Sequence, residues 1–281
     1  MTQSSEQNPQ LALPAGWYTV DLTVSVVGDP AKTAVAATRV DYVHVCPKDL
    51  YAVAGNEHET YPWDSPANGT SNILALVDEA LDGTTIHIGE GDFVIKNEMV
   101  LSKRLTVTGE GWEKSIIRMS PNANYRVLRM NNKSSVVERV TLANGRCAIY
   151  NGRDGDGTGV GVLISGNGGE LRDCRVTGAV SKEYYQNGAG VSVESNDAFV
   201  RRCLIDHNDN RYTGSSATIQ YGGGLYVTAG LVENCLVVSN YTRQGGGVHI
   251  TGGTVRNCTF AFNKAVRCQQ DNKTGGAAGG V

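Results

Sequence analysis

Apolar residues in the second half of the chain recur at every second position, inside a repeat of constant length. The segment Gly222–Asn240 contains Gly-Gly-Gly-Leu-Tyr-Val and then Val-Glu-Asn-Cys-Leu-Val, and the segment Gly245–Asn263 repeats this pattern. Cys235 and Cys258, at equivalent places, are 23 positions apart (235 to 258). A spacing of two is typical of strands, and a period of twenty-odd residues is typical of a solenoid whose repeats stack on one another.

The same apolar columns can be followed towards the N-terminus although the segments between them vary in length. The first column reads Leu128/Met130, Val162/Ile164, Val191/Val193, Leu225/Val227 and Val248/Ile250. The second reads Val137/Val140/Leu142, Leu171/Cys174/Val176, Val200/Cys203/Ile205, Val232/Cys235/Val237 and Val255/Cys258/Phe260. This pattern predicts an all-β fold, a parallel β-helix in which successive coils are about 4.8 Å apart.

Four of the seven cysteines, Cys174, Cys203, Cys235 and Cys258, occupy one position of the repeat. Val140 takes this position one coil earlier, so the position selects a modest apolar volume rather than sulfur chemistry. We therefore expect these thiols to pack inward as small hydrophobic groups. Disulfides between stacked neighbours, and metal or redox use, are the alternatives. The remaining cysteines have no assigned role and are Cys46, Cys147 and Cys268.

The N-terminal region has a different pattern. Residues 15–26 alternate apolar and polar side chains, a Gly-Asp-Pro turn follows, and residues 36–45 supply a partner strand. We expect residues 1–46 to be the C-terminal part of a β-sandwich, because a complete sandwich domain needs about 100 residues. Residues 47–70, which contain three of the seven prolines, are expected to form a linker.

The β-helix is expected to cover residues 71–281 and to begin with a short capping helix. Apolar residues at helical spacing, Ile73, Leu76, Val77 and Ala80, predict this helix over 71–82. Such a helix covers the unpaired edge of the first coil. The last residues, Gly275 to Val281, begin another glycine–valine strand, so we expect the coil there to be truncated.

These patterns resemble known proteins. The coil columns resemble right-handed parallel β-helix, or pectin-lyase-like, proteins, and the Gly-Gly-Gly element with Phe260-x-x-Asn263 resembles the repeats of chlamydial polymorphic outer-membrane proteins. Residues 15–26 resemble the closing hairpin of a PKD-like sandwich domain. The resemblance implies a bacterial secreted or cell-surface protein. It implies no single function, because this fold includes lyases, hydrolases, adhesins and tailspikes.

Composition narrows the possible partners. The net charge is −3 and no Lys/Arg run occurs, so we expect no nucleic-acid partner. No apolar run is long enough to span a bilayer, and the first residues lack the basic and apolar regions of a secretory signal. We expect an extracellular or cell-surface monomer whose signal lies outside this chain.

Candidate binding residues lie in the segments of variable length between the columns, which we expect to gather on one side of the solenoid and to carry binding. The variable segments are 143–158, 177–187, 209–221, 241–244 and 264–274, and they contain six of the twelve tyrosines, Tyr150, Tyr184, Tyr185, Tyr212, Tyr221 and Tyr241. Tyrosines beside charged residues are typical of a sugar-binding groove. We expect a substrate-binding site formed by Tyr184, Tyr185, Arg211 and Tyr212; the alternative is that the tyrosines pack their own loops against the β-helix.

The sequence gives weaker indications of catalytic residues than of binding residues. Ile205-Asp206-His207 resembles part of the Trp-Ile-Asp-His segment of pectate lyases, but Leu204 replaces the tryptophan and the family's other motifs are missing. In the next repeats these positions hold Val238-Ser239 and Ala261-Phe262, so they are ordinary repeat positions. Hydrolysis of a glycoside needs two carboxylates across a cleft, and Glu183 with Asp206 is the candidate pair.

The sequence also gives only weak indications of a metal or cofactor site. Asp154 and Asp156 begin an EF-hand-like run, but its twelfth position is Ser165 rather than a glutamate. We expect no cofactor, with calcium as the alternative. The function we expect is adhesion or carbohydrate binding to a polysaccharide or host glycan. The alternative is a polysaccharide lyase or glycoside hydrolase on the same fold.

Overall fold

The computed structural model describes residues 12–20, 24–25, 33–34, 40–146, 158–181, 187–211 and 220–265. The chain divides into two compact units, Met1–Pro47 and Lys48–Val281. The expected sites at Asp154, Asp156, Glu183, Tyr184, Tyr185 and Tyr212 lie outside the described residues, as do Tyr150, Cys147 and Cys268.

The first unit contains antiparallel strand pairs, as the alternating pattern predicts. Strand β1 (Gly16–Val20) pairs with β4 (Val40–Val45), and β2 (Val24–Ser25) pairs with β3 (Thr33–Ala34). Trp17 lies opposite His44, and the two rings stack with centroids 4.2 Å apart.

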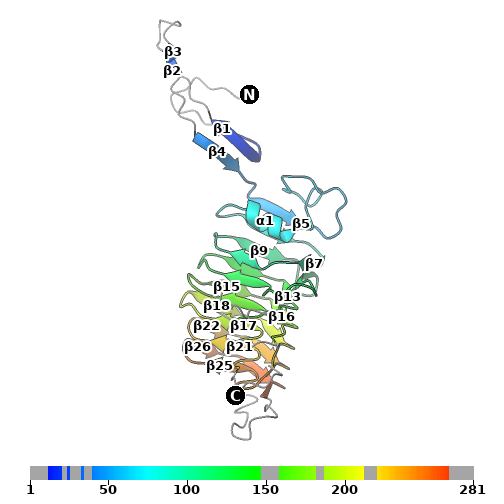
Figure 1. Ribbon diagram of the computed structural model, residues 1–281, viewed down its shortest axis with the longest axis vertical. Coiled ribbons are helices and arrows are strands. Elements are labelled where there is room, and N and C mark those ends of the chain that lie inside the picture. Colours follow the sequence, from blue (N-terminus) through cyan, green and yellow to red (C-terminus); the bar gives the residue numbers. More distant parts are fainter. Residues whose placement is uncertain are drawn as a thin grey trace. The chain divides into compact units, whose positions relative to one another are not determined.

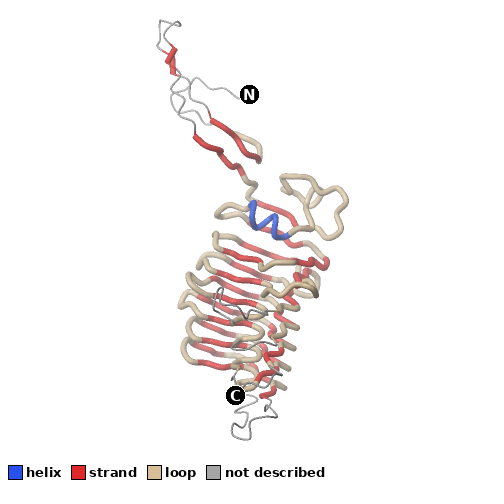
Figure 2. The backbone as a smooth tube through the Cα atoms, in the orientation of Figure 1, coloured by secondary structure: helices blue, strands red, loops and turns tan. Residues whose placement is uncertain are grey.

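The second unit is a parallel β-helix, in which successive coils contribute strands to three long sheets (Figures 1 and 2). Sheet I consists of β5 (Asp49–Ala52), β6 (Thr85–Ile88), β9 (Thr106–Gly109), β12 (Val136–Glu138), β15 (Gly169–Arg172), β18 (Ala198–Arg201), β22 (Leu231–Glu233) and β26 (Thr254–Arg256). Sheet II consists of β7 (Gly91–Ile95), β10 (Ser115–Met119), β13 (Thr141–Ala143), β16 (Arg175–Thr177), β19 (Leu204–Asp206), β23 (Leu236–Val238) and β27 (Thr259–Ala261).

Sheet III consists of β8 (Met99–Leu101), β11 (Leu128–Met130), β14 (Val162–Ile164), β17 (Val191–Val193), β21 (Leu225–Val227) and β25 (Val248–Ile250). A smaller sheet IV contains β20 (Asp209–Asn210), β24 (Tyr241–Thr242) and β28 (Lys264–Ala265). All described pairings in the second unit are parallel, as expected for a β-helix.

The core consists of the two apolar columns that the sequence pattern predicts. Val137, Leu171, Val200 and Val232 follow one another in register in sheet I, and each is fully buried. Sheet III adds a second column that includes Val191. The prediction that apolar residues at every second position form strands with one buried face is therefore confirmed.

The cysteine column also faces the core. Cys174, Cys203 and Cys235 are buried, Cys258 is half-buried, and all four are free thiols, so the inward packing is confirmed and no disulfide joins them. Burial raises the pKa of the Cys174 thiol to about 12, which keeps it protonated at neutral pH.

The repeated Gly-Gly-Gly element and the closing asparagine are parts of one packing arrangement. A Cβ on Gly224 would lie 2.5 Å from Cγ1 of Val237 and 2.9 Å from Nδ2 of Asn240. The same close approach recurs one coil later, where a Cβ on Gly247 would lie 2.7 Å from Nδ2 of Asn263. A side chain on the last glycine of each triplet would thus collide with the residues that end the coil, the asparagine among them.

The predicted helix is present but shorter than 71–82. Helix α1 spans Ile73–Glu79, and the side chain of Asn72 accepts a hydrogen bond from the backbone amide of Ala75 at 3.3 Å as an N-cap. Lys103 Nζ donates to the carbonyl oxygens of residues 77, 78 and 80 at 3.2, 2.9 and 2.7 Å. The helix ends here because the backbone of Ala80 leaves the helical region, with φ −55° and ψ 139°, and Lys103 satisfies carbonyl groups at this end.

The expectation of a linker over 47–70 needs a correction. Strand β5 lies within this range and pairs in parallel with β6, so it belongs to the first coil. Leu50 and Ala52 are buried there. The strand was missed because it is only four residues long and is followed by a proline-rich segment.

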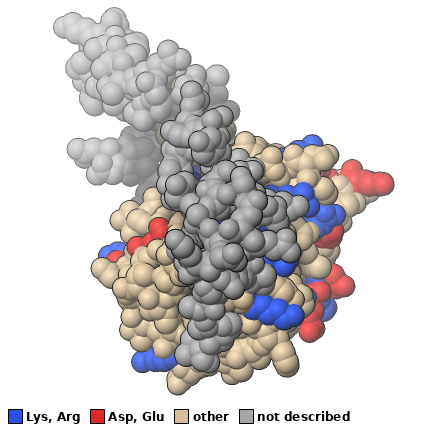
Figure 3. Space-filling view, turned by 60° about the horizontal axis from the view of Figure 1, so that its bottom comes forward, with Lys and Arg blue, Asp and Glu red and all other residues tan. Residues whose placement is uncertain are grey.

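Charged side chains cover much of the outer face of sheet I. Arg172 Nε donates to Glu138 at 2.7 Å, Arg201 Nε donates to Glu233 at 2.8 Å, and Arg256 donates to Glu233 at 2.6 Å. Acidic and basic side chains also lie beside one another along one flank in the space-filling view (Figure 3). The pairs join neighbouring coils, and this described face carries no patch of one sign.

Candidate functional site

The variable segments leave and rejoin the β-helix at the same place in successive coils. Before each segment, Arg146, Val180 and Asp209 form successive parallel bridges. After it, Thr158 bridges Asn187 and Tyr221 bridges Gln244, while the backbone amide of Gly188 donates to the carbonyl of Tyr221 at 2.9 Å. We call these two columns of residues the loop roots. The expectation that the insertions gather on one side is confirmed for the residues that flank them.

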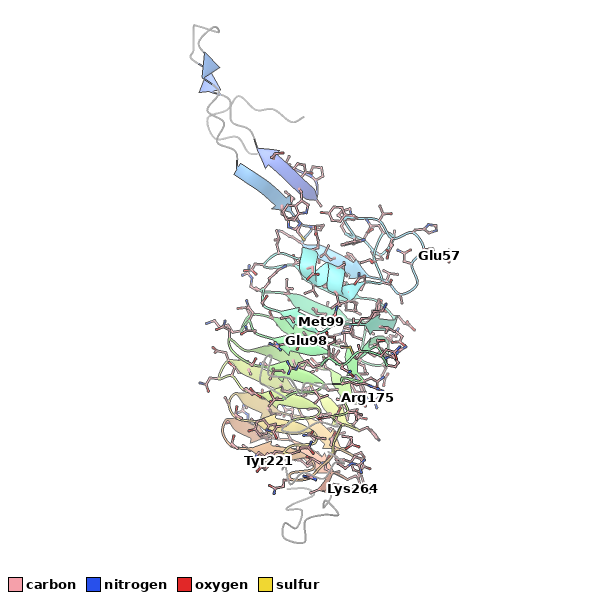
Figure 4. The ribbon with its side chains drawn as sticks, viewed as in Figure 1. Glu57, Glu98, Met99, Arg175, Tyr221 and Lys264 are labelled. Carbon is pink, nitrogen blue, oxygen red and sulfur yellow. The ribbon has the colours of Figure 1, made fainter. Side chains whose placement is uncertain are left out.

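An aromatic cluster lies on the returning side of the loop roots. Tyr226 and His249 are the outward-facing middle residues of β21 and β25 and lie in register, with ring centroids 5.7 Å apart and planes 5° apart. Tyr221, which ends the preceding variable segment, lies with its ring 4.2 Å from that of His249. All three side chains are half-buried. Figure 4 labels Tyr221 among the lower coils.

His249 is neutral at pH 7 in this environment. Partial burial lowers the pKa of its imidazole below the ordinary value of 6.5. The aromatic cluster of Tyr221, Tyr226 and His249 therefore presents three uncharged rings, each with a polar atom at its edge.

A second group lies on the leaving side of the loop roots, on sheet IV. Asp209, Tyr241 and Lys264 occupy equivalent positions in three successive coils. The guanidinium carbon of Arg211 lies 4.8 Å from the centre of the Tyr241 ring, and Lys264 Nζ lies 5.7 Å from it. Arg211 also forms an ion pair with Asp209, with N–O distances of 2.5 and 2.8 Å, and this ion pair raises the pKa of Arg211.

Of the four expected substrate-binding residues, Arg211 is the one within the described part of the chain. Its side chain is 43% exposed and holds a cation over Tyr241. Tyr221 and Tyr241, two of the tyrosines noted in the variable segments, are both at the loop roots. The expected group of Tyr184, Tyr185 and Tyr212 is in the undescribed segments.

Sequence reasoning missed Tyr226 and His249. A usable signal was present, because both are the middle residues of three-residue strands whose first and last residues belong to the first apolar column. Alternation places a middle residue on the outer face.

The catalytic candidates Asp206 and His207 lie where sheet II ends. Asp206 Oδ2 is 2.7 Å from His207 Nδ1, and Arg175 donates to both oxygens of Asp206 at 2.9 and 2.7 Å. The Asp206 side chain is 4% exposed, whereas that of His207 is 65% exposed. The guanidinium of Arg175 also lies 5.8 Å from the Trp112 ring.

This arrangement keeps the Asp206 carboxylate ionised at neutral pH. Burial by itself raises the pKa of Asp206, but hydrogen bonds from Arg175 and His207 outweigh it and hold the pKa below 3.8. In the tautomer that carries its proton on Nδ1, His207 donates a hydrogen bond to the ionised Asp206. Asp206 pairs in register with Val238, so the expectation that these are ordinary repeat positions is confirmed. The other carboxylate of the expected pair, Glu183, lies outside the described residues.

The described side chains do not form a metal site. Within the ranges that the structure describes, no group of three or more His, Cys, Asp or Glu residues is arranged to hold a metal ion. The calcium alternative at Asp154 and Asp156 falls in the segment between 146 and 158 and stays untested. No described helix is long and apolar enough to cross a membrane.

Comparison with known proteins does not assign the chain to a family. No protein-family model matches the chain, and no curated protein sequence matches it. Similar solved structures include the pectin methylesterase PemA from Erwinia chrysanthemi, with 12% identity, a TM-score of 0.46 and coverage of 79% of this chain and 68% of that chain.

Two further pectin methylesterase structures are similar to a lesser degree. The enzyme from Aspergillus niger has 11% identity and a TM-score of 0.37, with coverage of 83% of this chain and 92% of that chain. A complex with a hexasaccharide has 11% identity and a TM-score of 0.32, with coverage of 74% and 67%. None of these similarities supports the resemblance to chlamydial polymorphic outer-membrane proteins or to a PKD-like domain. The fold assignment rests on the stacked parallel sheets.

Proposed function

We propose that the protein binds carbohydrate along the edge that carries the loop roots. The observation that carries this proposal is the aromatic cluster of Tyr221, Tyr226 and His249 on the outer face of sheet III. Aromatic faces pack against the apolar faces of sugar rings, and the polar atoms at the ring edges hydrogen-bond to sugar hydroxyls. Three such rings in adjacent coils form a continuous surface rather than isolated exposed side chains.

The group on sheet IV supplies the polar partners that such a site needs. Asp209 accepts hydrogen bonds, Arg211 and Lys264 donate them, and Tyr241 offers a further aromatic face. In the coil from Tyr241 to His249 the chain passes from one group to the other without an insertion. Both groups therefore border the same edge of the same coil.

The repeat of the coils favours an extended ligand. Successive coils place equivalent positions about 4.8 Å apart along the axis. A polysaccharide is itself a linear repeat, so it contacts several coils in succession. We place this binding outside the cell, in a secreted or surface-attached protein that functions in adhesion to polysaccharide or to a host glycan.

Binding to a glycan array, followed by titration calorimetry with the best ligand, tests this proposal. Tyr221→Ala and Tyr226→Ala are each expected to weaken binding about fivefold, or about 1 kcal/mol, because ring burial is lost. Tyr61→Ala is the matched control, since Tyr61 is 40% exposed and its hydroxyl donates to Glu79, the last residue of the capping helix. Unchanged affinity in both variants, or an equal loss in the control, contradicts the proposal.

A carbohydrate-active enzyme is the second candidate. The specific observation in its favour is the 2.7 Å contact between Asp206 and His207, since a buried carboxylate that orients an exposed imidazole is an arrangement used in general-base catalysis. Incubation with acidic and neutral polysaccharides, with detection of unsaturated ends, reducing ends and released acid, distinguishes lyase, hydrolase and esterase activity. A product whose release stops in His207→Ala would establish an enzyme.

A further inference from the structure

Cys235 and Cys258 are free cysteines at equivalent positions in neighbouring coils. Each follows the corner between sheets I and II, and residues on both sides of the pair are in register, Glu233 with Arg256 and Leu236 with Thr259. In-register neighbours in parallel strands have Cα atoms about 4.8 Å apart, which lies inside the range compatible with a disulfide.

Direct contacts place the two sulfur atoms side by side. The Sγ of Cys258 accepts a hydrogen bond from the backbone amide of Cys235 at 3.4 Å. The Cys235 thiol donates to the carbonyl oxygen two residues before it at 3.3 Å, and the Cys258 thiol makes the equivalent contact at 3.2 Å. The two side chains therefore have the same orientation in neighbouring coils, and no other residue separates them.

Access distinguishes this pair from the rest of the cysteine column. Cys174 and Cys203 are each 2% exposed and Cys235 is 3% exposed, whereas Cys258 is half-buried. A small oxidant in solution therefore reaches Cys258 first. Burial raises the pKa of the Cys258 thiol, so access rather than acidity makes it the first to react. A hydrogen bond from the Cys203 thiol, with a further contribution from Cys258, lowers the pKa of Cys235, which favours Cys235 as the second partner.

We propose that Cys235 and Cys258 form an inter-coil disulfide when the protein meets a low-molecular-weight disulfide. The Cys258 thiolate attacks one sulfur of the oxidant and releases one thiolate, which leaves a mixed disulfide on Cys258. The Cys235 thiolate then attacks the Cys258 sulfur and releases the second thiolate. The two protein thiols are oxidised to one disulfide, the oxidant is reduced to two thiols, and the protein's two thiol protons pass to the released thiolates.

The order of events predicts different products for two single variants. With Cys235→Ser, the second step is blocked and the mixed disulfide accumulates on Cys258. With Cys258→Ser, the entry point is lost and Cys235 stays reduced. Cys174→Ser is the matched control, because Cys174 is in the same column but two coils before Cys235, and its reaction with the oxidant should match that of the unaltered chain.

Incubation of the full chain with oxidised glutathione, followed by alkylation and peptide mass mapping, tests the proposal. The expected product is one linked peptide pair containing Cys235 and Cys258, reversed by a reducing agent, with an upward shift in melting temperature because the bond closes a loop over 23 residues. A stable glutathione adduct on Cys258 in the unaltered chain, a link from Cys258 to Cys147 or Cys268, or retention of all free thiols would each overturn it.

Discussion

The side-chain oxygen of Asn240 accepts two hydrogen bonds from Asn208, one from its backbone amide and one from its side-chain amide, each 3.0 Å long. Asn263 accepts the same two hydrogen bonds from Asn240 one coil later, also at 3.0 Å. The three side chains are buried, and each Nδ2 also donates to a carbonyl of the preceding coil. This asparagine ladder satisfies the polar groups at the corner where the chain turns from sheet II to sheet IV.

Replacing the middle asparagine should destabilise the coils on both sides. Asn240→Leu leaves the two donors of Asn208 without their acceptor, and an unsatisfied buried polar group costs about 1 to 3 kcal/mol. Thermal unfolding followed by circular dichroism measures this loss. Asn124→Ala, a change at an exposed asparagine, is the control and should melt like the unaltered chain. Equal melting of the two variants would show that the ladder adds no stability.

A carboxylate in the apolar column of sheet I should unfold the neighbouring coils. Val232 is fully buried, and Val232→Asp places an unpaired carboxylate there at a cost of several kcal/mol. Val94→Asp is the matched control, because Val94 is 46% exposed on the outer face of β7. Chemical denaturation should show a large loss for the first variant and a small one for the second. A Val232→Asp protein as stable as the control would refute the assigned register.

Stability should fall at acidic pH through Asp206. Its pKa in the folded protein is below the ordinary value of 3.8, so the ionised form contributes stability above that value and the contribution is lost as the pH falls through the folded pKa. We expect Asp206→Asn to be less stable than the unaltered chain at pH 7 and to lose less stability on acidification below pH 3.8. Melting temperatures across pH 7 to 3 measure both effects. Parallel curves for the two proteins would mean that Asp206 is not linked to folding.

If the loop roots are the binding site, a substitution in the aromatic cluster should weaken glycan binding more than a substitution at His207. His207→Ala removes an exposed side chain at the corner after sheet II and is expected to leave glycan affinity within about twofold, since the aromatic cluster is unaffected. Tyr226→Ala is expected to weaken binding about fivefold by the loss of a ring face. Titration calorimetry on both variants gives the comparison. The opposite ranking would move the binding site to the Asp206–His207 corner.

Most of the fold was predictable because the apolar residues that form its core recur with a regular period in the sequence. Val137, Leu171, Val200 and Val232 recur at equivalent places in each coil, and burial of a column requires this recurrence. Strand β5 was not predictable in the same way. Its four residues show only one short alternation of polar and apolar side chains. Its assignment as a strand depends on pairing with β6, which lies more than thirty residues later.

The candidate site was only partly predictable. The sequence indicates that insertions gather on one side, and the flanking pairs such as Tyr221 with Gln244 confirm it. It does not indicate which side chains meet there, because contacts such as that between Tyr221 and His249 join residues from different coils. The partners of Asp206 were hidden for the same reason, since Arg175 comes from the coil before it.

The loop roots are joined from coil to coil by backbone hydrogen bonds, as from Gly188 to Tyr221 and from Gly222 to Gln244, and by side-chain bonds of residues at the roots themselves, as from the backbone amide of Tyr221 to Asn187. Because these bonds do not involve the inserted residues, an insertion can be lengthened, shortened or replaced without shifting the coils beneath it. The coil between Tyr241 and Gln244 needs only two intervening residues, while other coils at the same place accommodate long segments. Variation in ligand specificity is thereby uncoupled from folding, and a foreign peptide grafted between Arg211 and Gln220 should be displayed without loss of the solenoid.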